Sequence, residues 1–515
     1  MSARQGGRRR ARGGADRPDR SSGQLPKPMG VFRNPLPPVE LLDANDLGRL
    51  IDAAFRVLQE SGLEFLSARC LDILERNGCK IDRETGVARM DRATVEHFVA
   101  LAPETFTVHA RNPDRNTVMG GNYINFNTVG SPPNINDLDN GRRSGTYQAL
   151  VDLIRLNHSL GVCHTMGGSI VEPMDLPVPT RHLDNAYAIF KYTDRAAFVR
   201  TVSEFRARDA IEMVAIARGV SLDQLKSECS LLTSFNVNSP RRVDEELLEG
   251  LLCFGEHGQA VAVTPFTLAG AMSPVTVAGA LVQQTAEALS VIALSQMANP
   301  GAPVLFGGFT SNVDMKSGAP AFGTPEYVKA VLIGGQIARH FKLPYRSSNV
   351  NASNCVDAQS TYESAMSLWA VIMGHANIVH HGLGWLEGGL SASMEKCVID
   401  AEMIRQWVAS LAPLDMSDDA LAVDAIAGVA PGGHFFGEPH TLARFETAFY
   451  QPMVSDWRNF ENWEEAGAKN ATERANVIWK QMLEAYEEPP MDDAVDEALQ
   501  DYMKRRKHEL RNVQP

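Results

Sequence analysis

Two clusters of polar side chains follow neighbouring strand-like runs within residues 344–389. The first cluster comprises Ser347, Ser348, Asn349, Asn351, Ser353 and Asn354, with Asp357 and Gln359 shortly after them. The second comprises His380 and His381, with Trp385 and Glu387 after them. Polar groups this dense beside apolar strands usually line a site at the carboxyl ends of the strands. The stretch therefore predicts a pocket built from amide, hydroxyl and imidazole groups.

Several familiar catalytic signatures are absent from the sequence. It has no GxSxG elbow, no HExxH, no Walker A motif and no GxGxxG dinucleotide fingerprint. Because side chains alternate along a strand, His380 and His381 are expected to point to opposite faces, so that at most one enters a barrel interior. His164, at the end of another strand, could meet one of them, which leaves a histidine-based metal site open.

Carboxylates and aromatic rings also gather near the ends of the strand-like runs. The carboxylates are Asp357, Glu363, Glu387 and Glu395. Helix capping is the simpler role for Asp357, and negative charge beside a cationic substrate is the alternative. The aromatic residues of this region are Tyr123, Phe126, Phe266, Phe306, Phe309 and Trp385. Aromatic faces attract quaternary ammonium groups, although packing in the barrel core is the simpler role and is preferred for Phe306.

These residues must be positioned by a regular alternation of strands and helices. Eight strand-like runs lie at 123–127, 162–170, 197–202, 231–236, 260–265, 304–309, 345–349 and 377–381. Helical patterns fall at 146–159, 180–192, 208–219, 244–257, 274–297, 325–341, 357–374 and 393–411. Eight such units predict an α/β fold of the (β/α)8 TIM barrel type. An open doubly wound sheet is the alternative, but no GxGxxG follows the first strand.

Polar and glycine residues concentrate after the predicted strands and not before them. His164 precedes Gly167, and Gly307 and Gly308 end another strand. In a barrel this asymmetry marks the catalytic face. One polar loop means little, because such loops are polar in general, but several together favour a real site.

The predicted barrel occupies residues 121–411 and has additions on both sides. Residues 1–34 are predicted to be a disordered basic tail, and residues 35–120 an N-terminal helical segment. Residues 412–515 are predicted to be a helical extension that packs on the barrel. Within it, the glycine-rich loop 428–436 is expected to fold back over the barrel. The aromatic residues of the extension are expected to form a docking core; they are Trp457, Phe460, Trp463 and Trp479.

Composition narrows the functional classes. The 515 residues are 44% hydrophobic and carry a net charge of −13, which argues against general nucleic-acid binding. Seven cysteines occur without a CxxC pair, and no secretory signal is visible, so a cytoplasmic setting is predicted. The most apolar helix, at 275–297, is interpreted as buried, with no membrane contact, because its apolar run is interrupted by Gln283, Gln284, Glu287 and Gln296.

Four long blocks of the sequence resemble the trimethylamine methyltransferase family. They begin at Gly130 (GSPPNINDLDNGRRSGTYQALVDLIRL), Met272 (MSPVTVAGALVQQTAEALSVIALSQMANPG), Asp357 (DAQSTYESAMSLWAVIMGHANIVHHGLGWLEGG) and Val429 (VAPGGHFFGEPHT). The resemblance covers nearly all of the chain from about residue 35. It implies a (β/α)8 barrel methyltransferase that moves a methyl group from an amine to the cobalt of a separate corrinoid protein. It also implies self-association into a homo-oligomer.

The sequence departs from the trimethylamine-specific members at one point. Those relatives carry pyrrolysine near the barrel mouth, and its counterpart is expected within residues 348–354, where this chain has only ordinary residues. The resemblance is therefore to the non-pyrrolysine branch, whose members are similar to glycine betaine methyltransferase. A tertiary amine must be activated before nitrogen can leave, whereas a quaternary ammonium is already activated. The implied substrate is a methylated, quaternary amine.

The resemblance also implies roles for individual residues. The expected catalytic residues are His380, His381, Asn349 and Asn351, with a histidine bonded to a substrate carboxylate or placed near the cobalt. The expected substrate-binding residues are Tyr123, Phe126, His164, Phe309, Asn354, Asp357, Gln359, Glu363, Trp385 and Glu387; three of these, Asp357, Gln359 and Glu363, would support the loop at 349–354. Gly307, Gly308 and Gly384 are expected to contact the corrinoid.

Two alternatives to the methyltransferase stay open at this point. One is a barrel that binds betaines without turnover, and the other is a metal-dependent hydrolase that uses His164 and His381. No metal ligand set is predicted for the chain itself. The sequence has no DxHxxG cobalamin signature and no SAM-type glycine motif, so any corrinoid must arrive on a partner protein.

Overall fold

A computed structural model of the chain describes residues 26–200 and 202–512. Its centre is a sheet of eight parallel strands: β6 (Asn125–Thr128), β9 (Thr165–Gly167), β10 (Ala196–Phe198), β11 (Leu231–Phe235), β13 (Ala260–Val263), β15 (Val304–Gly307), β18 (Tyr345–Ser348) and β19 (Ile378–Leu383). Hydrogen bonds join them in the order β6-β19-β18-β15-β13-β11-β10-β9, and β9 also packs against β6. The (β/α)8 prediction is therefore confirmed, with all eight strands in the predicted places.

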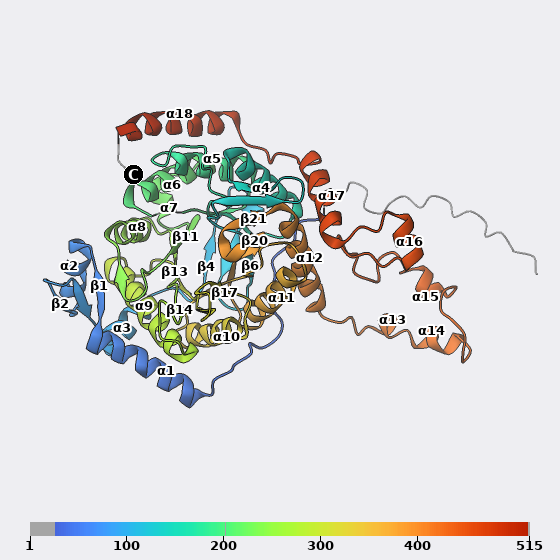
Figure 1. Cartoon of the computed structure of the whole chain (residues 1–515), viewed down its shortest axis with the longest axis horizontal. Helices are drawn as coiled ribbons and strands as arrows, with labels where there is room; N and C mark the ends of the chain where they lie inside the picture. The colour runs from blue at the N-terminus through green and yellow to red at the C-terminus, as the bar shows by residue number, and fades with distance from the viewer. Residues whose placement is uncertain (1–25, 201, 513–515) are drawn as a thin grey trace, which may run out of the picture.

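Helices connect these strands and surround the barrel (Figure 1). They are α4 (Tyr147–Leu160), α5 (Arg181–Tyr192), α6 (Glu204–Arg218), α8 (Glu245–Glu256), α9 (Val277–Ala298), α10 (Pro325–His340), α11 (Ala358–Met373) and α12 (Met394–Ser410), with the short α7 (Leu222–Leu225) after α6. Side-chain oxygens of Thr146, Thr276, Thr324 and Ser393 accept hydrogen bonds from the first turns of their helices, which explains where those helices begin.

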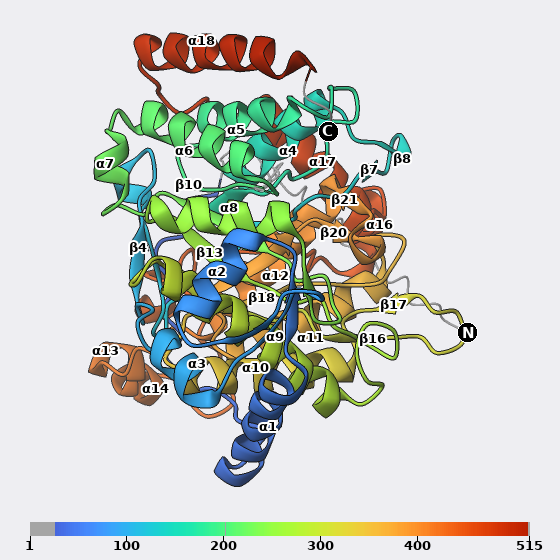
Figure 2. The same ribbon diagram turned by 90° about the vertical axis from the view of Figure 1, so that its left-hand side faces the viewer.

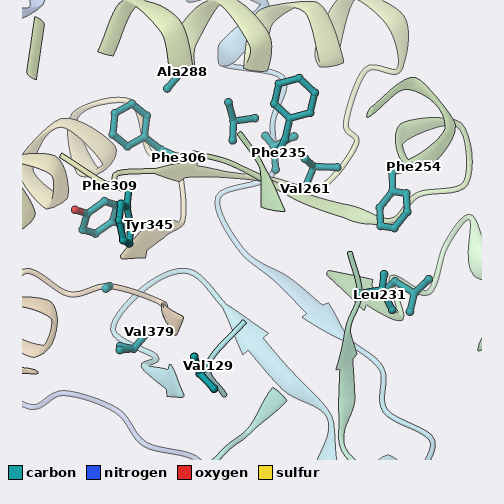
Figure 3. Close-up of a cluster of buried hydrophobic side chains, with 14 of the residues drawn as sticks. Val129, Leu231, Phe235, Phe254, Val261, Ala288, Phe306, Phe309, Tyr345 and Val379 are labelled. Carbon is teal, nitrogen blue, oxygen red and sulfur yellow. The ribbon is translucent and has the colours of Figure 1, made fainter. Parts of the chain in front are cut away.

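Apolar side chains form two separate layers around the barrel wall. One cluster lies inside and includes Ala196, Phe198, Leu232, Ala262, Leu305 and Ile378, together with residues of the hairpin β4 (Phe106–Val108) and β5 (Thr117–Met119). The larger cluster lies between the strands and the helices, and several of its members are labelled in Figure 3. Phe306 is fully buried in this outer layer, so its predicted core role is confirmed.

The N-terminal region covers one side of the barrel (Figure 2). It contains α1 (Ala44–Arg56), the π-helical turn Val57–Ser61, α2 (Ala68–Arg76) and α3 (Arg92–Val99), all of which pack against α9. A small sheet pairs β2 (Lys80–Asp82), β3 (Val87–Arg89) and β1 (Leu63–Phe65) with β12 (Arg242–Val243). Among the described residues, α9 is the one helix long and apolar enough to cross a membrane, and most of it is buried in the fold.

The loops at the carboxyl ends of the strands form two further small sheets. One sheet joins β20 (Trp385–Leu386), β21 (Ser391–Ser393), β7 (Asn134–Asp137) and β8 (Gly141–Ser144). The other joins β14 (Leu268–Ala269), β16 (Ser311–Val313) and β17 (Pro320–Ala321). Backbone pairing gives these loops a fixed shape, which is what a site at the strand ends requires.

The C-terminal region divides into a packed part and a projecting part. Helices α17 (Ala471–Glu484) and α18 (Asp493–Glu509) pack on α4, α5, α6 and α12. Residues 411–450 contain no buried residue, and α13 (Asp418–Leu421), α14 (Val423–Gly428), α15 (Pro439–Leu442) and α16 (Phe460–Glu465) project away from the barrel (Figure 1). We call residues 411–465 the arm; within it, Met453 and Val454 return to the barrel, where their amides donate to Glu402 of α12.

The arm contradicts two expectations for this region. The loop 428–436 lies in the arm and does not fold back over the barrel. Trp457 and Phe460 are exposed and do not dock on a core, whereas Trp479 lies against α12, where its Nε1 donates to Glu395 at 2.9 Å. The expectations failed because helical spacing reports an apolar face without saying what covers it.

Candidate functional site

The two polar clusters meet at the carboxyl ends of β18 and β19. Ser348 pairs with His380 across these strands, and Arg346 pairs with Ile378, which belongs to the inner apolar cluster. Because side chains two residues apart share a face, Arg346, Ser348 and His380 all face the barrel interior. The polar site therefore begins directly above the inner apolar cluster, on the side of the carboxyl ends of the strands.

His380 is held in one orientation by three neighbours. Its ring stacks on Phe198 with centroids 4.6 Å apart, and Asn127 Nδ2 donates to its Nδ1 at 2.6 Å. Its Nε2 lies 2.9 Å from the position that a Cβ would take at Gly130, so a larger residue there would push the ring away. Burial, and then the charge of Arg346, holds the pKa of His380 well below its ordinary value. The ring is therefore neutral at neutral pH.

Alternation along the strand predicted that His381 would point to the opposite face from His380, and this prediction is wrong. Its φ of 57° and a register shift in β19 turn the side chain so that its ring centroid lies 4.0 Å from that of His380. Its Nδ1 accepts a hydrogen bond from the Gly130 amide at 3.1 Å. Burial, with smaller contributions from His380 and Arg346, lowers the pKa of His381 as well. Both histidines are thus neutral neighbours at the carboxyl end of the barrel.

The loop after β18 is pinned by reciprocal hydrogen bonds. Asn351 Nδ2 donates to the Trp385 carbonyl at 2.6 Å, and Trp385 Nε1 donates to the Asn351 carbonyl at 2.9 Å. Asn349 Nδ2 donates to Gly382 O at 2.9 Å. Their Oδ1 atoms are buried without a hydrogen-bond partner among the described residues. Asn354, in contrast, is exposed at the rim.

The three polar residues predicted to support this loop lie directly behind it. Glu363 Oε2 accepts hydrogen bonds from the amides of Ala352 and Ser353, at 2.8 and 3.2 Å. Gln359 donates to the other oxygen of Glu363 at 2.9 Å. Asp357 forms a capping box with Ser360 at the start of α11, and the hydrogen bond from the Ser360 amide lowers the pKa of Asp357. These side chains position the loop from behind.

Aromatic rings gather beside His381. Phe309 lies 6.1 Å from Trp385, 5.6 Å from Phe322 and 5.1 Å from Phe266, measured between ring centroids. Trp385 also contacts the His381 ring at 4.2 Å. Phe266 is partly exposed, whereas Phe309, Phe322 and Trp385 are buried. The strand ends therefore present a wall of π-faces next to the two histidines.

Three residues predicted to bind substrate lie away from this wall. Tyr123 precedes β6, at the amino end of the barrel, with the Arg33 guanidinium over its ring at 4.3 Å. Phe126 points outward into the strand–helix core. His164 accepts from the Phe126 amide and donates to Gly30 O, so neither ring nitrogen can reach His381 or a metal. Burial lowers the pKa of His164 to about 4.

The remaining predicted residues have packing or rim positions. Glu387 lies at the rim and forms an ion pair with Arg142 at 2.8 Å. A Cβ at Gly307 would lie 2.3 Å from Thr264 Oγ1, and one at Gly384 would lie 2.6 Å from Cys397 Sγ. A Cβ at Gly308 would lie 3.1 Å from Gln284 Nε2. Close packing of neighbouring groups accounts for all three glycines, and their contact with a corrinoid stays a prediction.

Sequence reasoning missed two charged groups of the barrel. Lys396 and Asp400 form an ion pair with no exposed side-chain surface, and Lys396 Nζ also donates to Ser364 Oγ at 2.9 Å. Burial raises the pKa of Asp400. The second group is Arg346, whose guanidinium carbon lies 5.5 Å from the Phe309 ring centroid. An i,i+4 Lys–Asp spacing and an arginine inside a predicted barrel strand were the signals available in the sequence.

The structure offers no support for a metal-dependent hydrolase. Within residues 26–200 and 202–512, no group of three or more His, Cys, Asp or Glu side chains is arranged to hold a metal ion. A cavity of about 660 Å³ lies at the amino ends of the strands, where Phe106, Lys226 and Pro303 line it. Barrel enzymes act at the opposite end.

Comparison with known proteins places the chain in a family. A family model described as trimethylamine methyltransferase (MTTB) matches residues 5–511. A glycine betaine methyltransferase of Desulfitobacterium hafniense (strain Y51) is 33% identical over 476 residues, covering 92% of this chain and 98% of that protein. The trimethylamine methyltransferase MttB of D. hafniense (strain DSM 10664 / DCB-2) is 27% identical, covering 87% and 90%.

The family match runs through the barrel strands and both flanking regions, so it concerns the whole architecture and not a single motif. Among solved structures, the hydroxylamine MtmB complex aligns with 90% of this chain and 88% of its own, at 8% identity and a TM-score of 0.49. The chain belongs to the trimethylamine methyltransferase family, and it is a methyltransferase.

Proposed function

We propose that the chain takes a methyl group from a quaternary amine of the glycine betaine type and passes it to a corrinoid held by a separate protein. The observation that carries the proposal is the aromatic wall of Phe309, Phe322 and Trp385 at the carboxyl ends of the strands. Such faces attract trimethylammonium groups. The relative named as a glycine betaine methyltransferase supports the same substrate type.

The protonation state of the site favours a quaternary substrate. When the C–N bond of a quaternary amine breaks, both electrons stay on nitrogen and a neutral tertiary amine leaves without needing a proton. His380 and His381 have lowered pKa values and are neutral, so neither is poised to protonate a leaving amine. Residues 348–354 are ordinary amino acids and add no electrophile. The chain's part is to orient the substrate and keep water out, while the corrinoid supplies the nucleophile.

A methyl-transfer assay tests this function. Purified protein is incubated with reduced corrinoid and either glycine betaine or trimethylamine, and the demethylated amine is measured by mass spectrometry. Dimethylglycine from glycine betaine, with little dimethylamine from trimethylamine, is the expected result. If glycine betaine binds in a calorimeter but no methylated amine is ever demethylated, the chain is a binding protein and the proposal is wrong.

We also infer a reducing, cytoplasmic setting and a corrinoid-carrying protein that docks at the carboxyl end of the barrel. All seven cysteines are free thiols, and six of them are buried. The docking site is inferred from chemistry, because the methyl acceptor must reach the side of the substrate that faces away from the barrel floor. Co-purification with the corrinoid protein, and its loss when Asn354 at the rim is replaced by a bulky tryptophan, would test the docking site.

We infer further that the arm packs against a second copy of the chain. Its exposed apolar side chains are Leu414, Met416, Leu421, Val423, Ile426, Phe435, Phe436, Leu442, Phe445, Phe449, Trp457 and Phe460. Apolar surface this extensive needs lasting cover. A corrinoid carrier must leave after each transfer, and it is inferred to dock at the barrel end, so the permanent occupant is another copy of this chain.

A further inference from the structure

Arg346 is a buried cation without a counterion among residues 26–200 and 202–512. Its side chain reaches the barrel interior from β18, and the residue is 3% exposed. Its Nε and Nη1 atoms are shielded from solvent and have no hydrogen-bond partner among the described residues. No ion pair within 4.0 Å joins the guanidinium to a described carboxylate, and the charged groups that act on its pKa are Tyr327 and Tyr345. Burial lowers the pKa of Arg346 only to about 10, so the charge persists at neutral pH.

Apart from the face of the Phe309 ring, 5.5 Å from the guanidinium carbon, the neighbouring groups do not compensate this charge. Tyr327 and Tyr345 are the groups whose negative charge would favour it, but burial raises the pKa of Tyr327 to about 12 and that of Tyr345 still further, so both are neutral. Their hydroxyls already donate to the carbonyls of Ser348 and Val331. Two buried acids of the same end of the barrel have other partners: Asp400 pairs with Lys396, and Glu363 accepts from backbone amides.

An uncompensated buried charge costs several kcal/mol, so a position like this is retained when a ligand supplies the missing partner. A guanidinium offers a planar set of donors that fits a carboxylate at two points. Its carbon lies 5.5 Å from the centre of the Phe309 ring, which belongs to the aromatic wall. A small molecule with a carboxylate and a quaternary ammonium one methylene apart can therefore reach both.

We propose that Arg346 binds the carboxylate of the substrate, so that the enzyme selects zwitterionic quaternary amines over quaternary amines that lack a carboxylate. This inference rests on the proposed function. The aromatic wall binds the ammonium group of the substrate, and Arg346 binds its carboxylate. In this arrangement the carboxylate lies toward the interior and the trimethylammonium group against Phe309 and Trp385. The methyl to be transferred then points toward the open end of the barrel.

The experiment compares substrates and variants. Glycine betaine has the carboxylate, and choline has a hydroxymethyl group in its place, so their KM and kcat values are measured on the wild type and on Arg346→Gln. We expect the variant to raise KM for glycine betaine by about 100-fold, because one charge-assisted pair is lost, and to change KM for choline by less than about threefold. Arg339→Gln is the matched control, since Arg339 lies on α10 outside the barrel and bonds Gly374 O.

Two further measurements keep the inference testable whatever the variant does. If Arg346→Gln does not fold, Arg346→Lys is used, and its KM for glycine betaine should rise by about tenfold, because an ammonium cannot make the paired contact. On the wild type, dimethylglycine should inhibit and trimethylamine should not. The inference is overturned if choline and glycine betaine bind the wild type equally well, or if Arg346→Gln raises both KM values by the same factor.

The outcomes also separate this inference from the proposed function. If the wild type demethylates no methylated amine, the proposed function fails, while calorimetry with glycine betaine on the wild type and Arg346→Gln still tests the carboxylate contact. If the wild type turns over glycine betaine and Arg346→Gln keeps its KM, the proposed function stands and the role of Arg346 falls.

Discussion

The upper barrel and the arm break the usual rule of burial in opposite directions. In the upper barrel, polar atoms of Arg346, Asn349 and Asn351 are buried and have no partner in the part of the chain that the structure describes. In the arm, large apolar side chains such as Phe436 and Phe449 are exposed, at 84% and 76%. Buried polar groups are normally satisfied and large apolar patches are normally covered. The unpaired polar atoms are the basis of the ligand proposed for the barrel, and the exposed apolar side chains are the basis of the second copy inferred to cover the arm.

The comparison shows that the type of exposed or unpaired group indicates the type of partner to look for. Unpaired polar atoms in the barrel indicate a small ligand, and exposed apolar side chains in the arm indicate a protein surface. The barrel wall is fixed by eight hydrogen-bonded strands, and it surrounds a guanidinium whose Nε and Nη1 have no partner among the described residues. The arm has only short helices, so nothing within it can bury its apolar faces. Four experiments test this comparison.

The largest expected effect concerns a charge in the barrel that does have a partner. Lys396→Met leaves Asp400 buried without its cation and should lower the free energy of unfolding by about 3–5 kcal/mol. Denaturant unfolding measures the loss. Lys480→Met, which removes the exposed ion pair with Asp139, is the control and should cost less than about 1 kcal/mol. Equal losses in the two variants would mean that burial does not determine how much these ion pairs contribute to the free energy of unfolding.

The second experiment addresses the arm. Replacing Phe436 and Phe449 by aspartate places charge in the inferred interface and should weaken self-association by about 100-fold or more, or about 3 kcal/mol. Sedimentation or light scattering over a range of concentrations measures it. Asp substitution of exposed Val275 and Met315, outside the arm, should leave the assembly unchanged. A wild type that stays monomeric at high concentration would contradict the inference.

The third experiment uses pH to test the neutral, buried histidines. His164 has a pKa of about 4 in the folded chain against an ordinary value of 6.5, so the unfolded state takes up the proton first as pH falls. The fold is therefore fully stabilised above about pH 6.5 and loses about 2 kcal/mol from this residue by pH 5.

The measurement is the free energy of unfolding at pH 7, 6 and 5. His164→Gln should flatten the pH dependence, although it also removes two hydrogen bonds and lowers stability at every pH. His340→Gln, at an exposed position, should leave the slope as it is. If the free energy of unfolding of the wild type rises as the pH falls toward 5, the prediction is wrong.

The smallest effect concerns the aromatic wall. Phe309→Leu keeps an apolar side chain but removes a π-face, and it should raise KM by about threefold to tenfold, or about 1 kcal/mol. Because the ammonium group is common to both substrates, glycine betaine and choline should be affected equally, unlike the selective effect expected at Arg346. Phe254→Leu, in the strand–helix core, is the control for packing alone.

Much of the barrel could be predicted from local patterns. The eight strands and eight helices follow from alternation of apolar runs with helical spacing, and each lies within a few residues of its predicted bounds. The loop at 349–354 and its supports Asp357, Gln359 and Glu363 were also found, because polar residues after a strand and a helix cap are local signals. The orientation of His381 was not predicted correctly, because its positive φ reverses the alternation of side chains on which that prediction depended.

Residue types and their order determined the fold class, the family and the list of polar and aromatic groups at the strand ends. Tertiary structure alone decided which of them meet: Tyr123 lies at the wrong end, Phe126 and His164 face outward, and Arg346 joins His380, His381 and Phe309 in the interior. The physical reason is that composition and spacing act over a few residues, whereas the face, depth and partner of a side chain are set by strands brought together from across the chain.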